Sequence, residues 1–307
     1  MSIKISVVIP TFNRPSTIGK AVENILGNTV QPDEIIVIDQ SPNDLTYKAL
    51  LPFIEAGNLL YIKESFPSLS KAKNIGWKKA IGDIVAFTDD DAMVDVKWVE
   101  TIKKTFENDD LNIGVLGGKV LPLYEDRNPN WTFPKQWEYF LPVYDQGNSL
   151  GSFREGACPA GVNYSIYRSL LEKFAGFDES IGPQGGRNVQ IPCEDAELAI
   201  RLKQNGFNLI YNPDCIVYHP VPLSRQNQEF LNKRVLEDGA CSAYFQIKKT
   251  PSTIAHLISL IKSIVKYLYF SLVRLMGKKS DEDLSFLEGR ILVLFKYGLL
   301  KQDLSSL

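Results

Sequence analysis

Short apolar runs and amphipathic segments alternate along the first part of the chain. The runs are rich in β-branched residues and have strand length, which is typical of strands buried on both faces of a parallel sheet. Between them, apolar residues recur at helical spacing, as Ile18, Val22 and Ile25 do behind the capping residue Ser16. This alternation predicts an α/β fold with a mostly parallel, doubly wound sheet flanked by helices. The predicted strands cover residues 5–10, 34–39, 59–62 and 84–88, and the predicted helices cover residues 16–26, 45–54 and 68–79.

The pattern changes twice further along the chain. Residues 122–156 show no regular period, and beyond Pro222 the pattern becomes helical. We therefore expect an α/β domain over residues 1–222, with residues 122–156 as an insertion, and a helical extension over residues 223–307. Within the first domain we also expect helices at 96–106, 170–174 and 192–203, a strand at 114–120, a glycine-rich loop at 182–188, and strand-like pieces at 208–211 and 216–219.

The irregular segment 122–156 is rich in aromatic residues, including Trp131 and Trp137. Loops this long are usually functional or disordered, and an aromatic one is a poor candidate for disorder. Aromatic faces stack on the apolar faces of sugars, so the segment could be a lid over an acceptor. Packing of these rings onto their own domain explains the composition equally well, and both interpretations stay open.

Three consecutive carboxylates, Asp89, Asp90 and Asp91, end the apolar run of residues 84–88. Carboxylates this close together repel one another unless a cation or hydrogen-bond donors lie among them. Right-handed crossovers place this triplet, Thr11 and Asp39 along one edge of the sheet, where open α/β sheets bind their ligands. A divalent cation holding a phosphorylated ligand is the interpretation we favour, and a solvated turn that caps the next helix is the alternative.

Net charge, the turn after the first strand and the spacing of the cysteines argue against several classes of function. The net charge of −2 gives no overall case for nucleic-acid binding. The turn after the first strand, residues 10–15, contains no glycine, which excludes both a dinucleotide-binding fingerprint and a phosphate-binding P-loop. The 4 cysteines are widely spaced and suit a reducing cytosol, and the N-terminal apolar run predicts a strand rather than a signal peptide.

The C-terminal part combines apolar and basic residues. From Gly239 to Ser280 the chain has no acidic residue, and lysines interrupt the apolar stretch 254–276, so no uninterrupted run reaches the ~20 residues of a transmembrane helix. A basic amphipathic helix that contacts an anionic membrane through residues 248–279 fits this composition. A helix packed on the α/β domain or on a partner chain fits as well. The basic residues are Lys248, Lys249, Lys262, Lys266, Arg274, Lys278 and Lys279.

An ordered set of motifs from Pro10 to His219 resembles glycosyltransferase family 2, the inverting, metal-dependent transferases with the GT-A fold. The resemblance covers about the first 220 residues and includes a D-x-D motif at Asp89–Asp91 and an E-D motif at Glu194–Asp195. Lys73 stands where arginine is commoner in the family, and Cys193 stands where glycine is frequent, which weakens any inference about the donor. The residues that carry the resemblance are Pro10, Thr11, Phe12, Arg14, Asp39, Lys73, Asn74, Asp89, Asp90, Asp91, Gly161, Asn163, Glu194, Asp195 and His219.

The resemblance implies a role for each of these residues. Asp195 would be the catalytic base, and Asp91 with His219 would hold Mn²⁺ or Mg²⁺. Gly161, Asn163 and Glu194 would line the donor-sugar and acceptor site, which Trp131 and Trp137 would join from the aromatic insertion. The residues expected to bind the nucleotide and the donor are Pro10, Thr11, Phe12, Arg14, Asp39, Lys73, Asn74, Asp89 and Asp90.

The resemblance also implies the reaction and its partners. A hexosyltransferase of this kind moves a sugar from a nucleoside-diphosphate donor, most simply a UDP-sugar, to a hydroxyl group of a glycan, lipid-linked or protein acceptor, as in bacterial-type polysaccharide synthesis. We expect a cytoplasmic protein, peripheral on the inner membrane face if residues 248–279 bind lipid. A haloacid-dehalogenase-like phosphatase with Asp89 as nucleophile, and a glycan- or nucleotide-binding module without catalysis, are the alternatives.

Overall fold

The computed structural model describes residues 3–124, 126–134, 140–141, 143–250, 252–276 and 281–300. The chain forms two compact units, each assembled from several segments. We call the first the sheet unit; it consists of Met1–Glu125, Leu141–Asp178 and Glu194–Val221. We call the second the helical unit; it consists of Asp126–Phe140, Glu179–Cys193 and Pro222–Leu307. The domain boundaries expected from the sequence remain a proposal.

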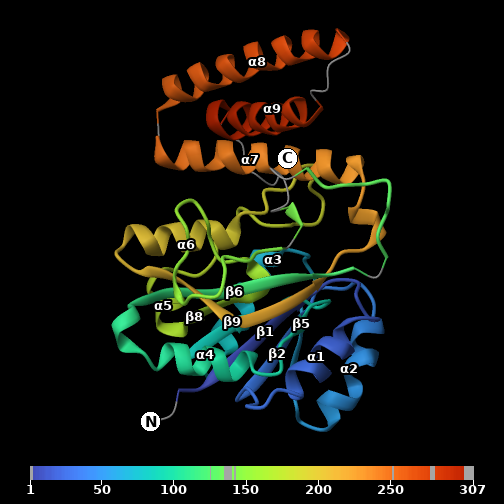
Figure 1. Cartoon of the computed structure of the whole chain (residues 1–307), viewed down its shortest axis with the longest axis vertical. Coiled ribbons are helices and arrows are strands. Elements are labelled where there is room, and N and C mark those ends of the chain that lie inside the picture. Colours follow the sequence, from blue (N-terminus) through green and yellow to red (C-terminus); the bar gives the residue numbers. More distant parts are fainter. Residues whose placement is uncertain are drawn as a thin grey trace. The chain divides into compact units, whose positions relative to one another are not determined.

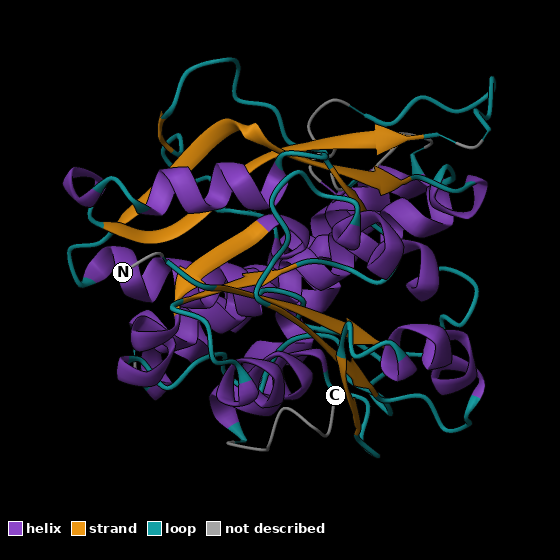
Figure 2. Cartoon of the chain, turned by 90° about the horizontal axis from the view of Figure 1, so that it is seen from below, coloured by secondary structure: helices purple, strands orange, loops and turns teal. Residues whose placement is uncertain are grey.

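The sheet unit contains a nine-stranded mixed sheet with the strand order β3-β2-β1-β4-β8-β6-β9-β5, and β7 pairs with β9 (Figures 1 and 2). Strands β1 to β4 pair in parallel, as the strand–helix alternation predicts. The strands are β1 Ile5–Thr11, β2 Glu34–Asp39, β3 Leu60–Lys63, β4 Ile84–Phe87, β5 Met93–Val94, β6 Ile113–Leu123, β7 Gly151–Ser152, β8 Tyr164–Tyr167 and β9 Asn208–Pro220. The helices of this unit are α1 Ile18–Leu26, α2 Leu45–Glu55, α3 Leu69–Lys79, α4 Trp98–Phe106, α5 Arg168–Lys173 and α6 Glu194–Gln204.

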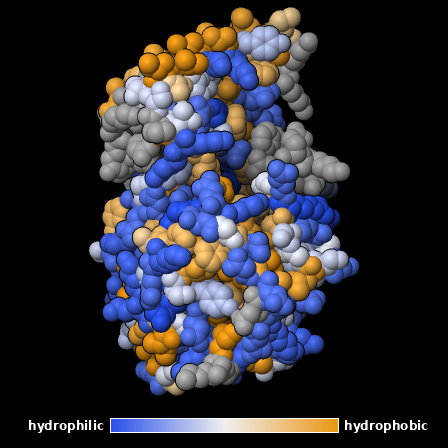
Figure 3. All heavy atoms as spheres, turned by 90° about the vertical axis from the view of Figure 1, so that its left-hand side faces the viewer, coloured by the Kyte–Doolittle hydropathy of each residue, from blue (hydrophilic) through white to orange (hydrophobic). Residues whose placement is uncertain are grey.

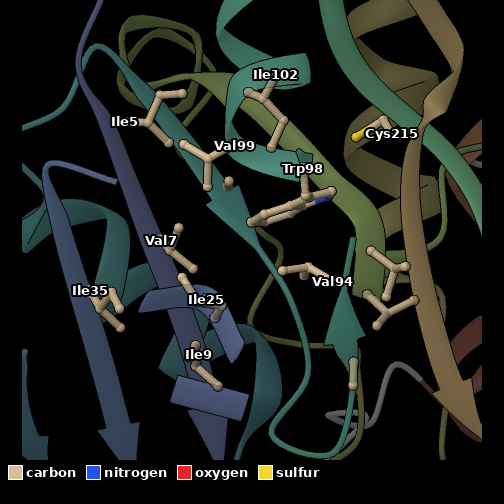
Figure 4. Packing of buried hydrophobic residues seen from close by; sticks show 14 of the residues in the cluster. Ile5, Val7, Ile9, Ile25, Ile35, Val94, Trp98, Val99, Ile102 and Cys215 are labelled. Atoms are coloured by element: carbon tan, nitrogen blue, oxygen red, sulfur yellow. The ribbon is translucent and has the colours of Figure 1, made fainter. Parts of the chain in front are cut away.

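Alternate residues of β1 point to opposite faces of the sheet, and each face has its own core. Ile5, Val7 and Ile9 pack with α1, α2 and α4 (Figure 4), whereas Val8 packs with α3, α5 and α6. Trp98, at the start of α4, is fully buried in the first of these cores. Burying one aliphatic side chain, such as Ile5 or Val8, stabilises the folded state by about 1.5–3 kcal/mol. The two cores together therefore hold the strands in the order on which the site depends.

Two strands that bear on the site do not follow from the hydrophobic pattern. β8 runs antiparallel between β4 and β6, at residues for which the sequence predicts no element, just before the short helix expected at 170–174. β5 has two residues and pairs antiparallel with β9, with Met93 opposite Tyr218 and Val94 opposite Val217. A strand of two residues has no period of its own, so only its pairing reveals it.

The two strand-like pieces expected near the end of the sheet unit form one strand, β9. Its register against β6 shifts between Gly118, which pairs with Asn212, and Lys119, which pairs with Ile216. The residues between the two registers form a bulge. A Cβ on Gly118 would lie 2.1 Å from the carbonyl oxygen of Cys215, so only glycine lets the strands approach at this point. The second register sets the position of His219.

The helical unit contains α7 Gln228–Lys249, α8 Thr253–Leu275 and α9 Asp281–Val293, followed by a π-helical turn at Leu294–Leu299 (Figure 1). α7 and α9 approach closely because a glycine of each faces the backbone of the other. A Cβ on Gly239 would lie 1.9 Å from the carbonyl oxygen of Phe286, and one on Gly289 would lie 1.9 Å from that of Leu236. The core of this unit is formed by Ile181, Val189, Ile191, Cys193, Ala240, Cys241, Ala243, Tyr244, Ile247, Leu260, Val293 and Leu294.

Candidate active site

Two charged clusters lie in the sheet unit. The first, which we call the β4 cluster, consists of Asp89, Asp91 and His219, whose potential ligand atoms all lie within 4.8 Å of one another. The aspartates follow the end of β4, where the apolar run gives way to a turn. His219 reaches them because β9 pairs with β5, the short strand directly after that turn. The sheet thus joins residues that are distant in the sequence.

The geometry of the β4 cluster fits a divalent cation. Nε2 of His219 lies 3.5 Å from Oδ2 of Asp89 and 3.5 Å from Oδ1 of Asp91. A six-coordinate cation with ligands at about 2.1 Å places neighbouring ligand atoms about 3 Å apart and opposite atoms about 4 Å apart. Nδ1 of His219 lies 2.9 Å from the carbonyl oxygen of Pro220 and must donate to it, because a carbonyl can only accept. With Nδ1 engaged by this carbonyl, Nε2 is the ring nitrogen that faces the two acids and could bind a cation between them.

Asp90, the middle residue of the triplet, points away from this cluster and towards β1. Its Oδ2 accepts a hydrogen bond of 2.6 Å from the Thr11 hydroxyl. Burial, helped by the charges of the neighbouring aspartates, raises the pKa of Asp90 to about 7, against the opposing effects of the Thr11 bond and Arg14. The partly exposed Arg14 guanidinium lies 3.4 Å from Oδ2 of Asp91. The turn after β1 is thus attached to the acid triplet at two points.

The second cluster, which we call the α6 cluster, consists of Lys73, Glu194 and Asp195. Nζ of Lys73 donates to Oε1 of Glu194 at 2.9 Å and to Oδ1 of Asp195 at 2.6 Å. The Lys73 side chain is 2% exposed, and its Nζ lies 5.1 Å from the centre of the Phe177 ring. The resemblance implies that Lys73 acts on the diphosphate, but the structure pairs this ammonium with the two acids of α6.

The α6 cluster tunes the ionisation of the proposed base. Burial raises the pKa of Asp195 to about 7, against the opposing effect of the Lys73 charge. Burial alone would lower the pKa of Lys73, but the two carboxylates outweigh it and raise that pKa, so the ammonium keeps its charge. A carboxylate with a pKa near neutrality is suited to accept a proton during a reaction.

Gly161 fixes the space beside Asp195. It begins a 3₁₀ turn, Gly161–Asn163, and a Cβ at this position would lie 2.0 Å from Oδ2 of Asp195 and 3.2 Å from Nζ of Lys73. Any larger residue would therefore displace the carboxylate. The sequence places Gly161 in the site, and the structure gives the physical reason why glycine stands there.

Two asparagines of the predicted site form hydrogen bonds within the sheet unit. Asn163 is fully buried; its Oδ1 accepts from the indole of Trp98 at 3.0 Å, and its Nδ2 donates to the carbonyl oxygens of Lys119 and Cys215. Asn74 is buried as well, and its amide bonds both backbone groups of Phe177. These contacts give both residues a role in holding loops of the sheet unit together, and a contact with donor or diphosphate stays a prediction.

Asp39, at the end of β2, is fully buried and bound on both oxygens. Oδ2 accepts from the hydroxyl of Tyr61 at 2.7 Å and from Nζ of Lys63 at 3.0 Å, while Oδ1 accepts from the backbone N–H of Ser41. Tyr61 and Lys63 do not figure in the site expected from the sequence. The parallel pairing of β2 with β3, which sets Asp39 beside Lys63, is the signal that could have found them.

The remaining predicted residues differ in accessibility. Pro10 is buried within β1, where it pairs with Ile38 of β2, and Phe12 is 45% exposed directly after the strand. Trp131 belongs to the helical unit, where its ring lies edge-on to Phe133, and its role towards an acceptor stays a prediction. Trp137 lies outside the described residues.

The two clusters supply complementary chemistry. The β4 cluster offers two carboxylates and an imidazole nitrogen to a hard or borderline divalent cation. The α6 cluster offers a carboxylate of raised pKa as a proton acceptor, and the charge of Asp89 contributes to that shift. A cation site beside a general base is the arrangement expected for displacement of a phosphorylated leaving group by a hydroxyl.

Comparison with known proteins identifies a consistent set of relatives. The family model described as "Glycosyl transferase family 2" matches residues 6–173. A glucosyl-dolichyl phosphate glucuronosyltransferase of Haloferax volcanii is 28% identical over 221 residues, which are 71% of this chain and 69% of the relative.

Solved structures give the same answer for the fold. The mannosyltransferase PcManGT of Pyrobaculum calidifontis, in complex with GDP-Man and Mn²⁺, has a TM-score of 0.57 at 17% identity, covering 100% of this chain and 74% of that one. GalNAc-T7 with UDP, GalNAc and Mn²⁺ has a TM-score of 0.55 at 19% identity, covering 76% of this chain and 47% of that one. The α/β fold of GT-A type predicted from the sequence is confirmed.

Proposed function

Because the chain belongs to glycosyl transferase family 2, we propose that it moves a sugar from a UDP-linked donor to an acceptor hydroxyl with inversion of the anomeric centre. The coarser statement needs no proposal: the chain is a glycosyltransferase of the kind that uses nucleotide-sugar donors. Inversion, the uridine nucleotide and the class of acceptor are the parts that we add.

One observation carries the proposal: a cation-type cluster and a carboxylate of raised pKa occur together in the sheet unit. The first suits a diphosphate, and the second suits the proton of an attacking hydroxyl. A phosphatase with Asp89 as nucleophile would leave the α6 cluster without a role. A binding module without catalysis would not need a base whose pKa lies near neutrality.

Asp195 is the residue that we propose as general base. Lys73 binds its Oδ1, which leaves Oδ2, beside Gly161, to take the proton of the acceptor hydroxyl. The hydroxyl oxygen then forms its bond to the anomeric carbon as the bond to the diphosphate breaks, and this single displacement inverts the centre. Placing a general base typically contributes about two to four decades of rate.

Asp89, Asp91 and His219 would hold the divalent cation, Mn²⁺ or Mg²⁺. When bound there, the cation would neutralise the charge that develops on the leaving diphosphate. The nitrogen ligand favours Mn²⁺ slightly over Mg²⁺. Asp90 and Thr11 would face the ribose, and Asp39, held by Tyr61 and Lys63, would face the base of the nucleotide.

The class of acceptor is also part of the proposal. We keep three classes, a glycan, a lipid-linked sugar and a protein hydroxyl, in bacterial-type polysaccharide or glycan synthesis. The Haloferax volcanii relative is named for a dolichyl phosphate substrate, which supports the lipid-linked class. We propose that the protein works in the cytoplasm, with peripheral contact at the inner membrane face.

A panel of nucleotide sugars tests the donor. A ligand at 100 times its dissociation constant should stabilise the folded state by about 2.7 kcal/mol, so thermal shifts with Mn²⁺ present will rank UDP-, GDP- and TDP-linked sugars. We expect UDP-sugars to give the largest shifts and the product of the best donor to have the inverted anomeric configuration by NMR. A larger shift with GDP-sugars would refute the uridine assignment, and a retained configuration would refute the single displacement.

A further inference from the structure

Helix α8 exposes large apolar residues from its first turn to its last. Figure 3, which looks roughly along this helix, shows hydrophobic residues gathered on its outer surface. Many of these residues follow the three- and four-residue steps of a single helix face. Leu275 is 84% exposed and Ile254 is 72% exposed, values typical of charged surface residues. The exposed large apolar residues of α8 and its C-cap are Ile254, Leu257, Ile258, Ile261, Ile264, Val265, Leu268, Tyr269, Leu272, Leu275 and Met276.

A different face of α8 packs within the helical unit. His256, Leu260 and Ser263 are buried, and Nε2 of His256 lies 2.6 Å from the carbonyl oxygen of Thr250. Two of these three buried residues are polar, whereas the exposed stripe consists almost wholly of aliphatic residues. The usual distribution for a helix of a soluble unit is therefore inverted, so the stripe is not explained by packing inside this unit.

The charges on α8 have one sign. The segment from Thr253 to Met276 contains no acidic residue, and the exposed Lys262 and Lys266 lie beside the apolar stripe. Arg274 is paired with Asp281 at 3.1 Å, so the two lysines supply the net positive charge of the exposed face. Lysines at the edge of an apolar stripe can extend their charged ends towards phosphate groups while their stems stay in contact with lipid.

The same lysines argue against a spanning orientation. Among the described residues, α8 is the one helix long and apolar enough to cross a membrane by length and composition. In that orientation Lys262 and Lys266, near the middle of the helix, would sit at the bilayer centre, where a charge is costly. Lying flat, the helix would keep them at the level of the headgroups.

We propose that α8 lies in the interfacial layer of a membrane that contains anionic lipids, with its apolar stripe inserted and its lysines at the phosphates. Insertion of such a face reaches about 5–10 Å into the boundary between headgroups and acyl chains. A second copy of this chain fits less well, because a two-fold axis through the middle of α8 would bring Lys262 and Lys266 of one copy against those of the other. The binding follows from the helical unit alone and does not depend on the proposed reaction.

Vesicle flotation of the full chain tests this surface. The probes are vesicles of phosphatidylcholine alone and vesicles with about 30% phosphatidylglycerol, chosen to separate apolar from electrostatic contributions. We expect the protein to float with the anionic vesicles and to bind the neutral ones at least tenfold more weakly. A protein that stays in the dense fraction with both preparations overturns the proposal.

Two triple variants of matched composition locate the surface. Leu257→Gln, Ile261→Gln and Leu268→Gln remove the centre of the stripe, while Leu45→Gln, Ile81→Gln and Leu223→Gln remove similarly exposed apolar residues elsewhere. Glutamine keeps the helix propensity of α8, and circular dichroism checks that both variants fold. We expect at least a tenfold loss of vesicle binding in the first variant and less than a twofold loss in the second. Equal losses in both would overturn the assignment to α8.

A charge variant and a mass measurement complete the test. Lys262→Gln with Lys266→Gln should reduce binding to anionic vesicles to the level seen with neutral ones. Light scattering of the wild type should give a mass that the first triple variant does not change. A dimer that this variant dissociates, without vesicle binding by the wild type, would assign the stripe to a second copy and overturn the lipid proposal. Glycosyl transfer to a soluble acceptor should be the same for all α8 variants.

Discussion

The two charged clusters of the sheet unit balance their negative charge in different ways. The α6 cluster contains its own cation, since the buried ammonium of Lys73 bonds both Glu194 and Asp195. The β4 cluster instead sets two carboxylates around a histidine, and the cation beside it is the partly exposed guanidinium of Arg14, 3.4 Å from Oδ2 of Asp91. The acids of the first cluster are therefore paired inside the fold, whereas we propose that the second takes up a divalent cation from solution.

This difference separates two tasks that need opposite properties. A base must keep a fixed position and a defined pKa through every turnover, and a permanent lysine partner provides both. A site for a leaving diphosphate must gain positive charge when the nucleotide binds and lose it when the product leaves. An exchangeable cation meets this need, and a buried lysine could not.

The largest expected effect is that of Asp195→Asn. The amide cannot accept the proton, so transfer should fall by about two to four decades, while the affinity for nucleotide stays within about twofold. Transfer rates at saturating donor and nucleotide affinity by calorimetry provide the two measurements. Turnover like that of the wild type would remove Asp195 from the role of base.

The next effect is on stability. Lys73→Met leaves the buried carboxylate of Glu194 and the partly buried one of Asp195 without their cation, so the free energy of unfolding should fall by roughly 3–5 kcal/mol. The matched control is Lys71→Met on the same helix, because Lys71 pairs with Glu64 at 3.2 Å on the surface and should contribute less than about 1 kcal/mol. Urea unfolding measures the free energy of unfolding of both variants. Equal losses would contradict the conclusion that Lys73 neutralises the two acids of the α6 cluster.

A smaller effect is expected for His219→Ala, and it should depend on the cation. Loss of one of three ligands should raise the concentration of Mn²⁺ needed for half-maximal transfer by about 10–100-fold, a range estimated from substitutions around metal sites. Saturating Mn²⁺ should restore most of the rate, and chelation with EDTA should abolish it in both proteins. An unchanged metal titration would exclude His219 from the site.

The smallest expected effect is the pH dependence of transfer. Because burial raises the pKa of Asp195 to about 7, the carboxylate is protonated below that pH and cannot act as base. The ratio kcat/KM should therefore fall about tenfold per unit as the pH decreases below 7, and level off above it. A profile measured from about pH 5.5 to about pH 8.5 tests this, and a flat profile over that range would contradict the assignment.

The sequence predicts local features of the site well and its long-range contacts poorly. The apolar run before Asp89 and the acids that open α6 are visible because each depends on neighbours in the chain. The meeting of His219 with Asp91 depends on β5, whose two residues have no pattern, and on the bulge in β9. These features follow from strand register, which a hydrophobic period does not encode.

The sequence also does not show which groups a polar side chain will bind. Asn163 and Lys73 occur in motifs associated with ligands, yet their polar groups are bound inside the protein, to Trp98 and to the α6 acids respectively. A polar residue beside a site can serve the ligand or the scaffold, and only the distances between distant elements distinguish the two. The family resemblance predicted the reaction class and the fold because it draws on the whole order of motifs.

The hydrogen bond between His219 and Pro220 has an evolutionary consequence. The acceptor that sets the histidine tautomer is a main-chain carbonyl of the adjacent residue, so no side-chain substitution elsewhere can delete it. The orientation of this ligand is therefore robust to drift in the surrounding sequence. The α6 cluster lacks that protection, since both hydrogen bonds of the Lys73 ammonium to its acids join two side chains. Among diverging relatives, we therefore expect the orientation of His219 to be less sensitive to substitutions at neighbouring positions than the position of Asp195.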